Sequence, residues 1–470
     1  MAPAKKKACA HQNVLLDASD HGRKTAGFER VPVDKRIAAT TRSGRVPDSP
    51  SGPAAPDAST FPGPLVLPDD ELALHPRYPP QSLRSWVNGG YRNPITHDRK
   101  TLYVADVPRI EDSAAFMREW AEPDVEDLVD PAEFPRLEHP DTADLVGYLA
   151  AFYHPLEVKL QPAPMRFVRW EAGGEADMVG LATGDRTVVG VRARPSKDEI
   201  ARMQLNLSDL LDALMGVVPG DAYACVLVVA QDLYEDEEDD FCCGRAYGGS
   251  RISVVSSFRY RPVLDLAFGV EVGHMWPLAH CVRFVEGFCE DFERENGCGE
   301  EGDKKRKRVG RKATVDEPGG EAVLDLKKKP HTALGAAINA AKKVVVPKTK
   351  EDQRGLWFSR VARTAAHELG HCFGMDHCVY YACVMQGTAG LGEDARQPPY
   401  LCPVCEARIV YGLGEMGVVE GGKGGRWVEG RQREVERERM EAMRAFCEGW
   451  KGVGMFAGYW GWLEQRLKTT

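Results

Sequence analysis

Apolar positions in the middle of the chain follow first the spacing of strands and then that of a helix. Residues 186–194 and 251–258 have strand character, and residues 223–231 form a continuous apolar run that suits a strand buried on both faces. Leucines recur at helical spacing over residues 207–218, and Pro219-Gly220 ends that pattern. Strand, helix and strand in this order predict an α/β fold class.

A second helical pattern begins near residue 357 and has two unlike faces. The apolar face, which belongs in a core, carries Phe358, Val361, Ala362, Ala365, Leu369, Cys372 and Phe373. The roughly opposite face carries Trp357, Arg360, Thr364, His367 and His371. This second face is predicted to line a cleft.

Apolar periodicity is weak at both ends of the chain and in one internal stretch. Residues 1–60 are predicted to form a disordered tail, because they offer too little apolar surface to offset the entropy of ordering. A main domain is expected over residues 61–415, with a low-complexity basic insertion at residues 299–350. Residues 416–470 are expected to form a helical extension that packs on this domain. The basic run KKRKR at 304–308 is interpreted as a solvated loop, with a nuclear-import signal as the alternative.

Composition narrows the classes of function. The chain of 470 residues has a net charge of −9, which argues against nucleic acid as the main partner. No apolar run reaches the length of about eighteen residues that a membrane span needs, and the first ten residues lack the apolar segment of a secretory signal. We therefore expect an intracellular protein, cytoplasmic or nuclear, and a monomer. In a reducing compartment the thirteen cysteines are expected to be thiols and metal ligands rather than disulfides.

The stretch HELGHCFGMDH, which begins at His367, has the spacing of a metal site. His367 and His371 are four residues apart on one helix, so both imidazoles can hold one ion, and Glu368 beside them suits a general base. Gly374 accepts the left-handed conformation that ends a helix, which lets His377 return to the same ion. Three neutral imidazoles leave a fourth position open, and an open position is typical of a catalytic zinc site.

Two pairs of cysteines follow these histidines. Cys378 and Cys383 form one pair and Cys402 and Cys405 the other, which is the usual layout of a four-thiolate structural zinc site. The sequence therefore predicts two zinc ions per chain, one catalytic and one structural. The cysteines expected to be packed thiols instead are Cys372, on the core face of the helix, and the adjacent Cys242 and Cys243.

With Met385 soon after it, HELGHCFGMDH resembles the metzincin metalloproteases, and HCVYYACVM followed by CPVC resembles one branch of them, the archaemetzincins. The segment between Met385 and Cys402 is one residue shorter than in the family pattern, which a loop tolerates. The resemblance implies a metzincin-like zinc protease domain with a mixed twisted sheet and an active-site helix, and aminopeptidase-like action. It also implies a turn at Met385 and a peptide substrate that lies as an added strand beside Arg251–Phe258.

Zinc-dependent hydrolysis of peptide bonds, with Glu368 as the base, is thus the favoured function. The alternative is a non-catalytic, zinc-stabilised interaction protein. Glu368 argues against that alternative, because a structural zinc site does not need this carboxylate. Tyr380, Tyr381 and Tyr400 are candidates for stabilising the oxyanion, since they lie nearby in the sequence.

Overall fold

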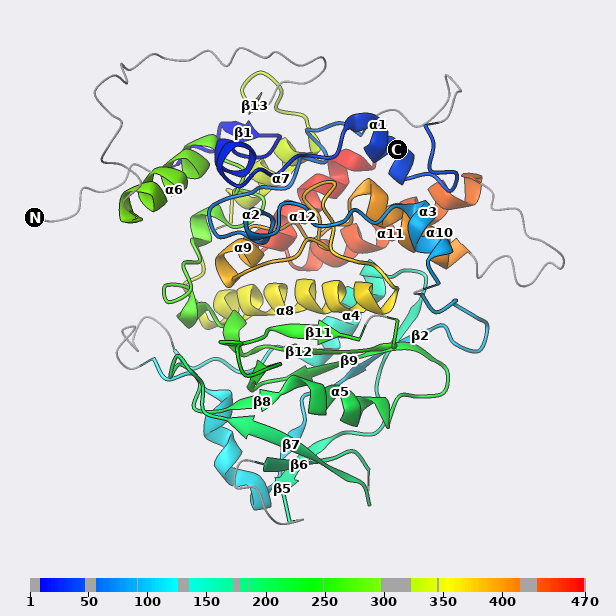
Figure 1. Ribbon diagram of the computed structural model, residues 1–470, viewed down its shortest axis with the longest axis vertical. Coiled ribbons are helices and arrows are strands. Elements are labelled where there is room, and N and C mark those ends of the chain that lie inside the picture. The colour runs from blue at the N-terminus through cyan, green and yellow to red at the C-terminus, as the bar shows by residue number, and fades with distance from the viewer. Residues whose placement is uncertain are drawn as a thin grey trace, which may run out of the picture.

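The computed structural model places two mixed sheets in the lower half of Figure 1 and most helices in the upper half, around the long helix α8 (Lys350–Cys372). The residues that it describes are 9–46, 56–90, 92–125, 135–171, 178–184, 186–247, 249–296, 323–344, 346–414 and 429–468. None of the described helices is both long and apolar enough to cross a membrane.

A five-stranded sheet lies directly beneath α8 (Figure 1). Its strands follow the order β11 (Gly244–Ala246), β12 (Ile252–Ser256), β9 (Ala222–Val229), β2 (Thr101–Ala105) and β4 (Glu157–Leu160). β11 pairs antiparallel with β12, and the other neighbours are parallel. Every residue of β9 is buried, because alternate side chains enter the apolar cores on the two faces of the sheet. The expected α/β fold with a mixed sheet is confirmed.

A six-stranded sheet forms the lower end of the molecule. Its strands follow the order β10 (Asp232–Tyr234), β8 (Gln204–Asn206), β7 (Val188–Arg194), β6 (Met178–Ala182), β5 (Arg166–Arg169) and β3 (Arg109–Ile110). Helix α5 (Leu207–Met215) contacts both β7 of this sheet and β12 of the other, and its leucines are fully buried. This helix and β7 are the elements that the apolar pattern predicts for residues 186–218.

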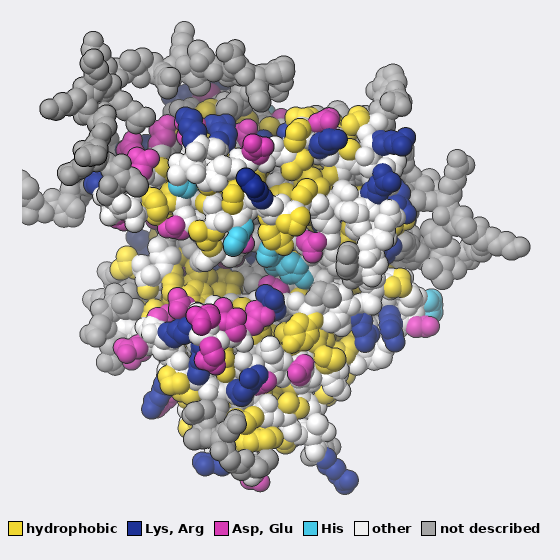
Figure 2. Space-filling view, viewed as in Figure 1, with side chains coloured by type: hydrophobic (Ala, Val, Ile, Leu, Met, Phe, Trp, Pro, Cys, Tyr) yellow, Lys and Arg dark blue, Asp and Glu magenta, His cyan; other side chains and the backbone are white. Residues whose placement is uncertain are grey.

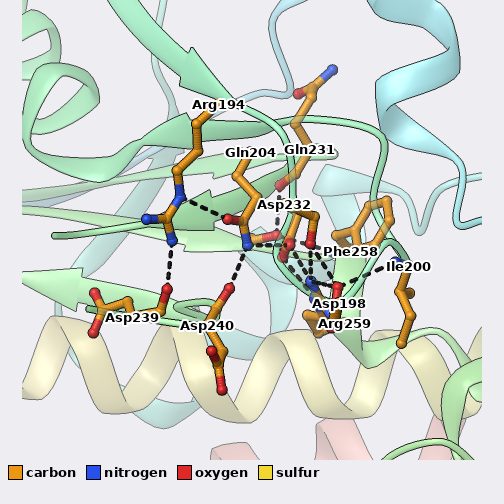
Figure 3. Close-up of polar contacts among 12 residues, drawn as sticks. Arg194, Asp198, Ile200, Gln204, Gln231, Asp232, Asp239, Asp240, Phe258 and Arg259 are labelled. Atoms are coloured by element: carbon orange, nitrogen blue, oxygen red, sulfur yellow. Dashed lines mark hydrogen bonds and ion pairs between the residues drawn. The ribbon is translucent and has the colours of Figure 1, made fainter. Parts of the chain in front are cut away.

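A buried ionic cluster joins the end of the six-stranded sheet to the segment after β12 (Figure 3). The guanidinium of Arg259 is fully buried and pairs with Asp232, also fully buried, and with Asp198. Gln204 donates a hydrogen bond of 2.8 Å to Asp232. The adjoining loop, residues 235–240, consists of acidic residues only. In it, the Asp239 carboxylate accepts hydrogen bonds of 3.1 Å from the backbone N–H groups of residues 235 and 236. This acidic loop is therefore closed by its own hydrogen bonds.

Helices pack on the upper face of the five-stranded sheet in two layers. α8 lies against β11, β12 and β9, and it is covered by α4 (Thr142–Phe152) and α12 (Gly454–Arg466). The remaining helices are α1 (Val33–Ala39), α2 (Glu71–Leu74), α3 (Leu83–Asn88), α6 (Val282–Glu295), α7 (Ala333–Ala341), α9 (Leu391–Ala395), α10 (Pro403–Gly414) and α11 (Glu429–Gly449), with short 3-10 or π turns η1 (His21–Thr25), η2 (Asp112–Ala121), η3 (Phe258–Tyr260), η4 (Pro262–Leu264) and η5 (Val272–His274). One apolar core takes in residues from Ala39 to Leu463, so the C-terminal helices share the core of the main domain.

The N-terminal segment differs from the disordered tail expected over residues 1–60. Residues 9–46 include β1 (Asn13–Leu15), which pairs antiparallel with β13 (Val323–Asp325), and α1. Val14 and Phe28 are buried against residues far away in the sequence. The prediction is wrong for these residues because their apolar partners come from distant parts of the chain, which a local pattern does not reveal.

The insertion expected over residues 299–350 is ordered in its second part. Residues 323–344 include β13 and α7, while the basic run 304–308 lies outside the described residues. α7 packs closely on α12, where Gly461 lies against the backbone of Ala336 and the side chain of Ala340. The alanine-rich sequence that resembles low complexity is thus a helix whose small side chains permit a close helix contact.

Candidate metal centres

Helix α8 brings the first two histidines to the surface only at its C-terminal end. Thr349 and Asp352 cap its N-terminus with reciprocal side-chain hydrogen bonds. Trp357 is fully buried, and Arg360 and Thr364 are almost so, which contradicts the expectation that this whole face lines a cleft. The five-stranded sheet covers one face of α8, and helices and loops cover the rest. From Gly355 to the end of the helix, only His367 and His371 are partly exposed.

His367 and His371 direct one ring nitrogen each toward a common point. Their Nε2 atoms lie 3.0 Å apart. The Nδ1 atom of His367 lies 2.7 Å from the carbonyl oxygen of Val384, and that of His371 lies 2.6 Å from the carbonyl oxygen of Met375. These backbone contacts hold the rings and leave both Nε2 atoms for a metal, an arrangement typical of metal-binding histidines.

His377 returns to the same point from outside the helix. Gly374 has a φ of +74°, and its N–H bonds the carbonyl of His371 at 2.8 Å, so the chain turns sharply there. The His377 ring centroid lies 5.4 Å from that of His367 and 5.1 Å from that of His371. Burial lowers the pKa of all three histidines, that of His377 to about 3, which favours the neutral form that binds metals.

Glu368 lies between α8 and the edge strand β11. Its side chain packs against Gly244, where an added Cβ would lie 3.2 Å from the glutamate Cγ. Burial raises the pKa of Glu368 to about 8, and the nearby charge of Arg245 acts in the opposite direction. Arg245 itself forms an ion pair of 3.2 Å with Glu235. A carboxylate with a raised pKa beside three converging imidazoles suits proton transfer near neutral pH.

The three candidate histidines are partly exposed to solvent. In the space-filling view, histidine side chains gather at the centre of the face, between the helical part and the sheets, with acidic side chains along the lower rim (Figure 2). Among the described residues, the candidate ligand atoms of His367, His371 and His377 all lie within 4.8 Å of one another. Three neutral nitrogen donors that open onto solvent fit a zinc ion with a free coordination position.

The four cysteines of the two pairs form a second cluster that is closed to solvent. Cys378, Cys383, Cys402 and Cys405 place their sulfur atoms within 4.8 Å of one another. All four are at most 1% exposed. The fully buried Arg408 lies close enough to interact electrostatically with three of the thiols. Four thiolates around one zinc carry excess negative charge, which a buried guanidinium offsets, so this set fits a structural zinc ion.

Comparisons with known proteins agree with this geometry. The model of the peptidase family M54 matches residues 328–410, which contain both clusters. Human archaemetzincin-2 is 22% identical over 360 residues, covering 76% of this chain and 72% of the relative. Archaemetzincin from the archaeon Aeropyrum pernix is 35% identical over 86 residues, covering 18% of this chain and 44% of the relative.

For this chain, these matches support the archaemetzincin family. They indicate that the protein is a zinc metallopeptidase, a hydrolase. The crystal structure of archaemetzincin from Methanopyrus kandleri is 15% identical, with a TM-score of 0.31, and covers 67% of this chain and 97% of that one.

The strand and the tyrosines that were expected beside a substrate lie elsewhere in the structure. Residues 251–258 contain β12, which is paired on both sides, so the free edge beside the histidines is β11. Tyr380, Tyr381 and Tyr400 are each at most 3% exposed, so their hydroxyl groups face the core and not a substrate. Met385 is fully buried, with its thioether packed against Gly370 of α8.

Two features of the structure are not predicted from the sequence. The ring of Tyr78 lies 5.7 Å from that of His377, and residue 78 comes from an N-terminal loop without a motif. Among the described residues, Cys9, His11 and His274 form a further cluster with ligand atoms within 4.8 Å of one another. Only the short Cys-x-His pattern at Cys9 hints at it in the sequence. Cys372, Cys242 and Cys243 belong to no such cluster of described residues.

Proposed function

We propose that this protein hydrolyses peptide bonds at the three-histidine cluster, with His367, His371 and His377 as zinc ligands and Glu368 as the general base. The observation that carries the proposal is the convergence of three partly exposed imidazoles, two of them with Nε2 atoms 3.0 Å apart, beside a buried carboxylate. A purely structural zinc site has no use for such a carboxylate or for an open side.

His367, His371 and His377 would hold a zinc ion, which would supply Lewis-acid activation of the scissile carbonyl and of water near neutral pH. Glu368 lies one residue from the first ligand and accepts the proton of the attacking water. The protonated Glu368 then gives this proton to the leaving amine. The packing of its side chain against Gly244 fixes the carboxyl group between the histidines and the edge strand.

The edge strand β11 could bind an extended peptide. One side of β11 pairs with β12, and none of the described strands pairs with the other. A substrate that adds to this edge as a strand would place its backbone beside the Glu368 carboxyl group. We propose aminopeptidase-like action on a peptide bound at the edge of β11, on the basis of the family resemblance.

The four-cysteine cluster is proposed to hold a second, structural zinc ion. Cys378 follows His377 directly, and its N–H bonds the carbonyl of Met385 at 2.7 Å. The cysteine cluster therefore anchors the chain at the residue that directly follows the third histidine. This ion would stabilise the fold and thereby keep His377 in position.

Turnover of defined peptides tests this function. The full chain would be assayed on a synthetic peptide library as purified, after removal of metal with a chelator, and after zinc is added back. We expect hydrolysis that the chelator abolishes and zinc restores. A zinc-loaded, folded protein that cleaves no peptide would support the non-catalytic alternative instead.

Matched peptides with free and acetylated N-termini test the mode of cleavage. Aminopeptidase-like action predicts release of the first residue from the free peptide and no cleavage of its acetylated partner. Cleavage within the acetylated peptide would contradict exopeptidase action while leaving the peptidase activity itself established.

A further inference from the structure

Three side chains that could bind a metal meet near the N-terminus, and a fourth, Cys281, contacts one of them. Cys9, His11 and His274 place their ligand atoms within 4.8 Å of one another. The sulfur atoms of Cys9 and Cys281 are 3.1 Å apart, although these two residues are 272 positions apart in the chain. Together they offer two sulfur and two nitrogen donors, a set that is common in tetrahedral structural zinc sites.

Each of the two histidines has one buried ring nitrogen that lacks a hydrogen-bond partner, Nδ1 in His11 and Nε2 in His274. The other nitrogen is occupied in both rings. Nδ1 of His274 lies 3.0 Å from the Glu271 carboxylate, and His11 makes a hydrogen bond with the backbone of Leu278. A buried nitrogen left without a hydrogen-bond partner destabilises the fold, and metal coordination removes that cost. Carboxylate and carbonyl partners on the far nitrogen are typical of histidines that bind metals.

The surroundings of this cluster hold the histidine ring and the Cys281 side chain in place. The His274 ring stacks on Phe284 with centroids 4.2 Å apart. Cys281 is the N-cap residue of α6, and the backbone N–H groups that follow it point toward its thiol. The ammonium of Lys342 lies nearby, held at 2.6 Å by the carbonyl of Ala10.

The separation of the two sulfur atoms is also informative. At 3.1 Å it exceeds the length of about 2.05 Å of a disulfide bond. Two sulfur atoms bound to one zinc ion at about 2.3 Å each would lie within about 4 Å of each other. The pair is therefore close enough to share an ion without forming a covalent bond.

We propose that Cys9, His11, His274 and Cys281 bind a zinc ion that clamps the N-terminal segment to the body of the protein. The segment adjoins this region through β1, where the Leu15 N–H bonds the carbonyl of His280 at 2.7 Å. A cross-link between residues so far apart in sequence removes much conformational freedom from the unfolded chain. It also accounts for the order of a segment that has little apolar surface of its own.

Metal counting on the full chain tests the proposal. Native mass spectrometry under reducing conditions would compare the wild type with the Cys9→Ser/His11→Ala double variant, which is expected to hold one zinc ion fewer. The Cys289→Ser variant is the matched control, since Cys289 is a half-buried thiol on α6 in the same apolar cluster but outside the ligand set. We expect its zinc content to equal that of the wild type. Equal zinc content in the double variant would overturn the proposal.

Thiol reactivity of the wild type provides a test that does not depend on the folding of a variant. Cys9 is only partly buried, so alkylation followed by peptide mapping reports its state. We expect Cys9 to resist alkylation until a strong chelator is added. Protection that only a reductant removes would show a Cys9–Cys281 disulfide, and immediate reaction would show a free thiol. Either result overturns the zinc site.

Discussion

The three-histidine cluster and the four-cysteine cluster adjoin in the chain at His377 and Cys378, yet they differ in access to solvent. The cysteines are at most 1% exposed, whereas the three histidines are partly exposed. A closed set of donors leaves no room for a substrate, while an open set does. The loop that contains His377 and Cys378 therefore has two proposed roles: His377 contributes to catalysis, and Cys378 contributes to stability.

The largest effect on activity is expected at the open cluster. His371→Ala removes one ligand of the proposed catalytic zinc, so turnover should fall by more than about 10⁴-fold. Thermal unfolding should change little, because His371 is partly exposed at the end of α8. Peptide turnover and the melting temperature measured on one sample check both statements. A variant that unfolds but stays active in its folded fraction would reverse the assigned roles.

The closed cluster should give the opposite pattern. Cys402→Ser leaves three fully buried thiols without a complete site, and we expect the free energy of unfolding to fall by about 3–5 kcal/mol. Activity should fall as a consequence, because the segment that carries His377 loses its anchor. Denaturant unfolding measures the first effect. An unchanged stability would show that the four cysteines hold no structural ion.

A smaller effect should follow from displacing a ligand without removing it. An added Cβ at Gly387 would lie 2.7 Å from Nδ1 of His377, so Gly387→Ala should shift that ring. Changes around a metal ligand typically cost about 10–100-fold in activity or metal affinity. Gly390→Ala is the control, because nothing lies within 4 Å of its added Cβ. Equal turnover in the two variants would argue against His377 as a ligand.

The smallest expected effect concerns a histidine outside the described clusters. Burial lowers the pKa of His139 to about 4, and its Nε2 lies 2.8 Å from the Ser257 hydroxyl. The unfolded chain takes up this proton near pH 6.5 and the folded chain does not, so stability falls as the pH drops from about 6.5 to 4. Between pH 7 and 5.5 this one group should cost about 1 kcal/mol. His139→Asn should lack that part of the pH dependence, as paired unfolding curves at the two pH values would show.

Both clusters in the second half of the chain were accessible from sequence because their members lie within one short region. His367 to Cys405 is local, and helix geometry fixes the relation between positions four apart. By contrast, Cys9 and Cys281 are 272 positions apart, and no local pattern predicts such a meeting. A metal site can therefore be predicted from a motif when its ligands are close together in the sequence, but not when they are far apart.

The fold follows the same rule. The buried strand β9 and helix α5 were predicted, because their apolar residues repeat over one continuous stretch. The order of residues 9–46 and of α7 was missed, since they are held by contacts with distant segments such as β13 and α12. The burial of Trp357 was missed for the same reason, as its indole N–H bonds the carbonyl of Ser257 at 2.7 Å.

The most direct measurement for the proposed mechanism is turnover by Glu368→Gln with the zinc content determined on the same sample. The amide keeps the size of the side chain but cannot accept the proton of the attacking water. Because Glu368 is not one of the proposed ligands, we expect the zinc content to equal that of the wild type. Turnover should fall by about 10²–10⁴-fold. Wild-type turnover in this variant would contradict the role of Glu368 as the general base.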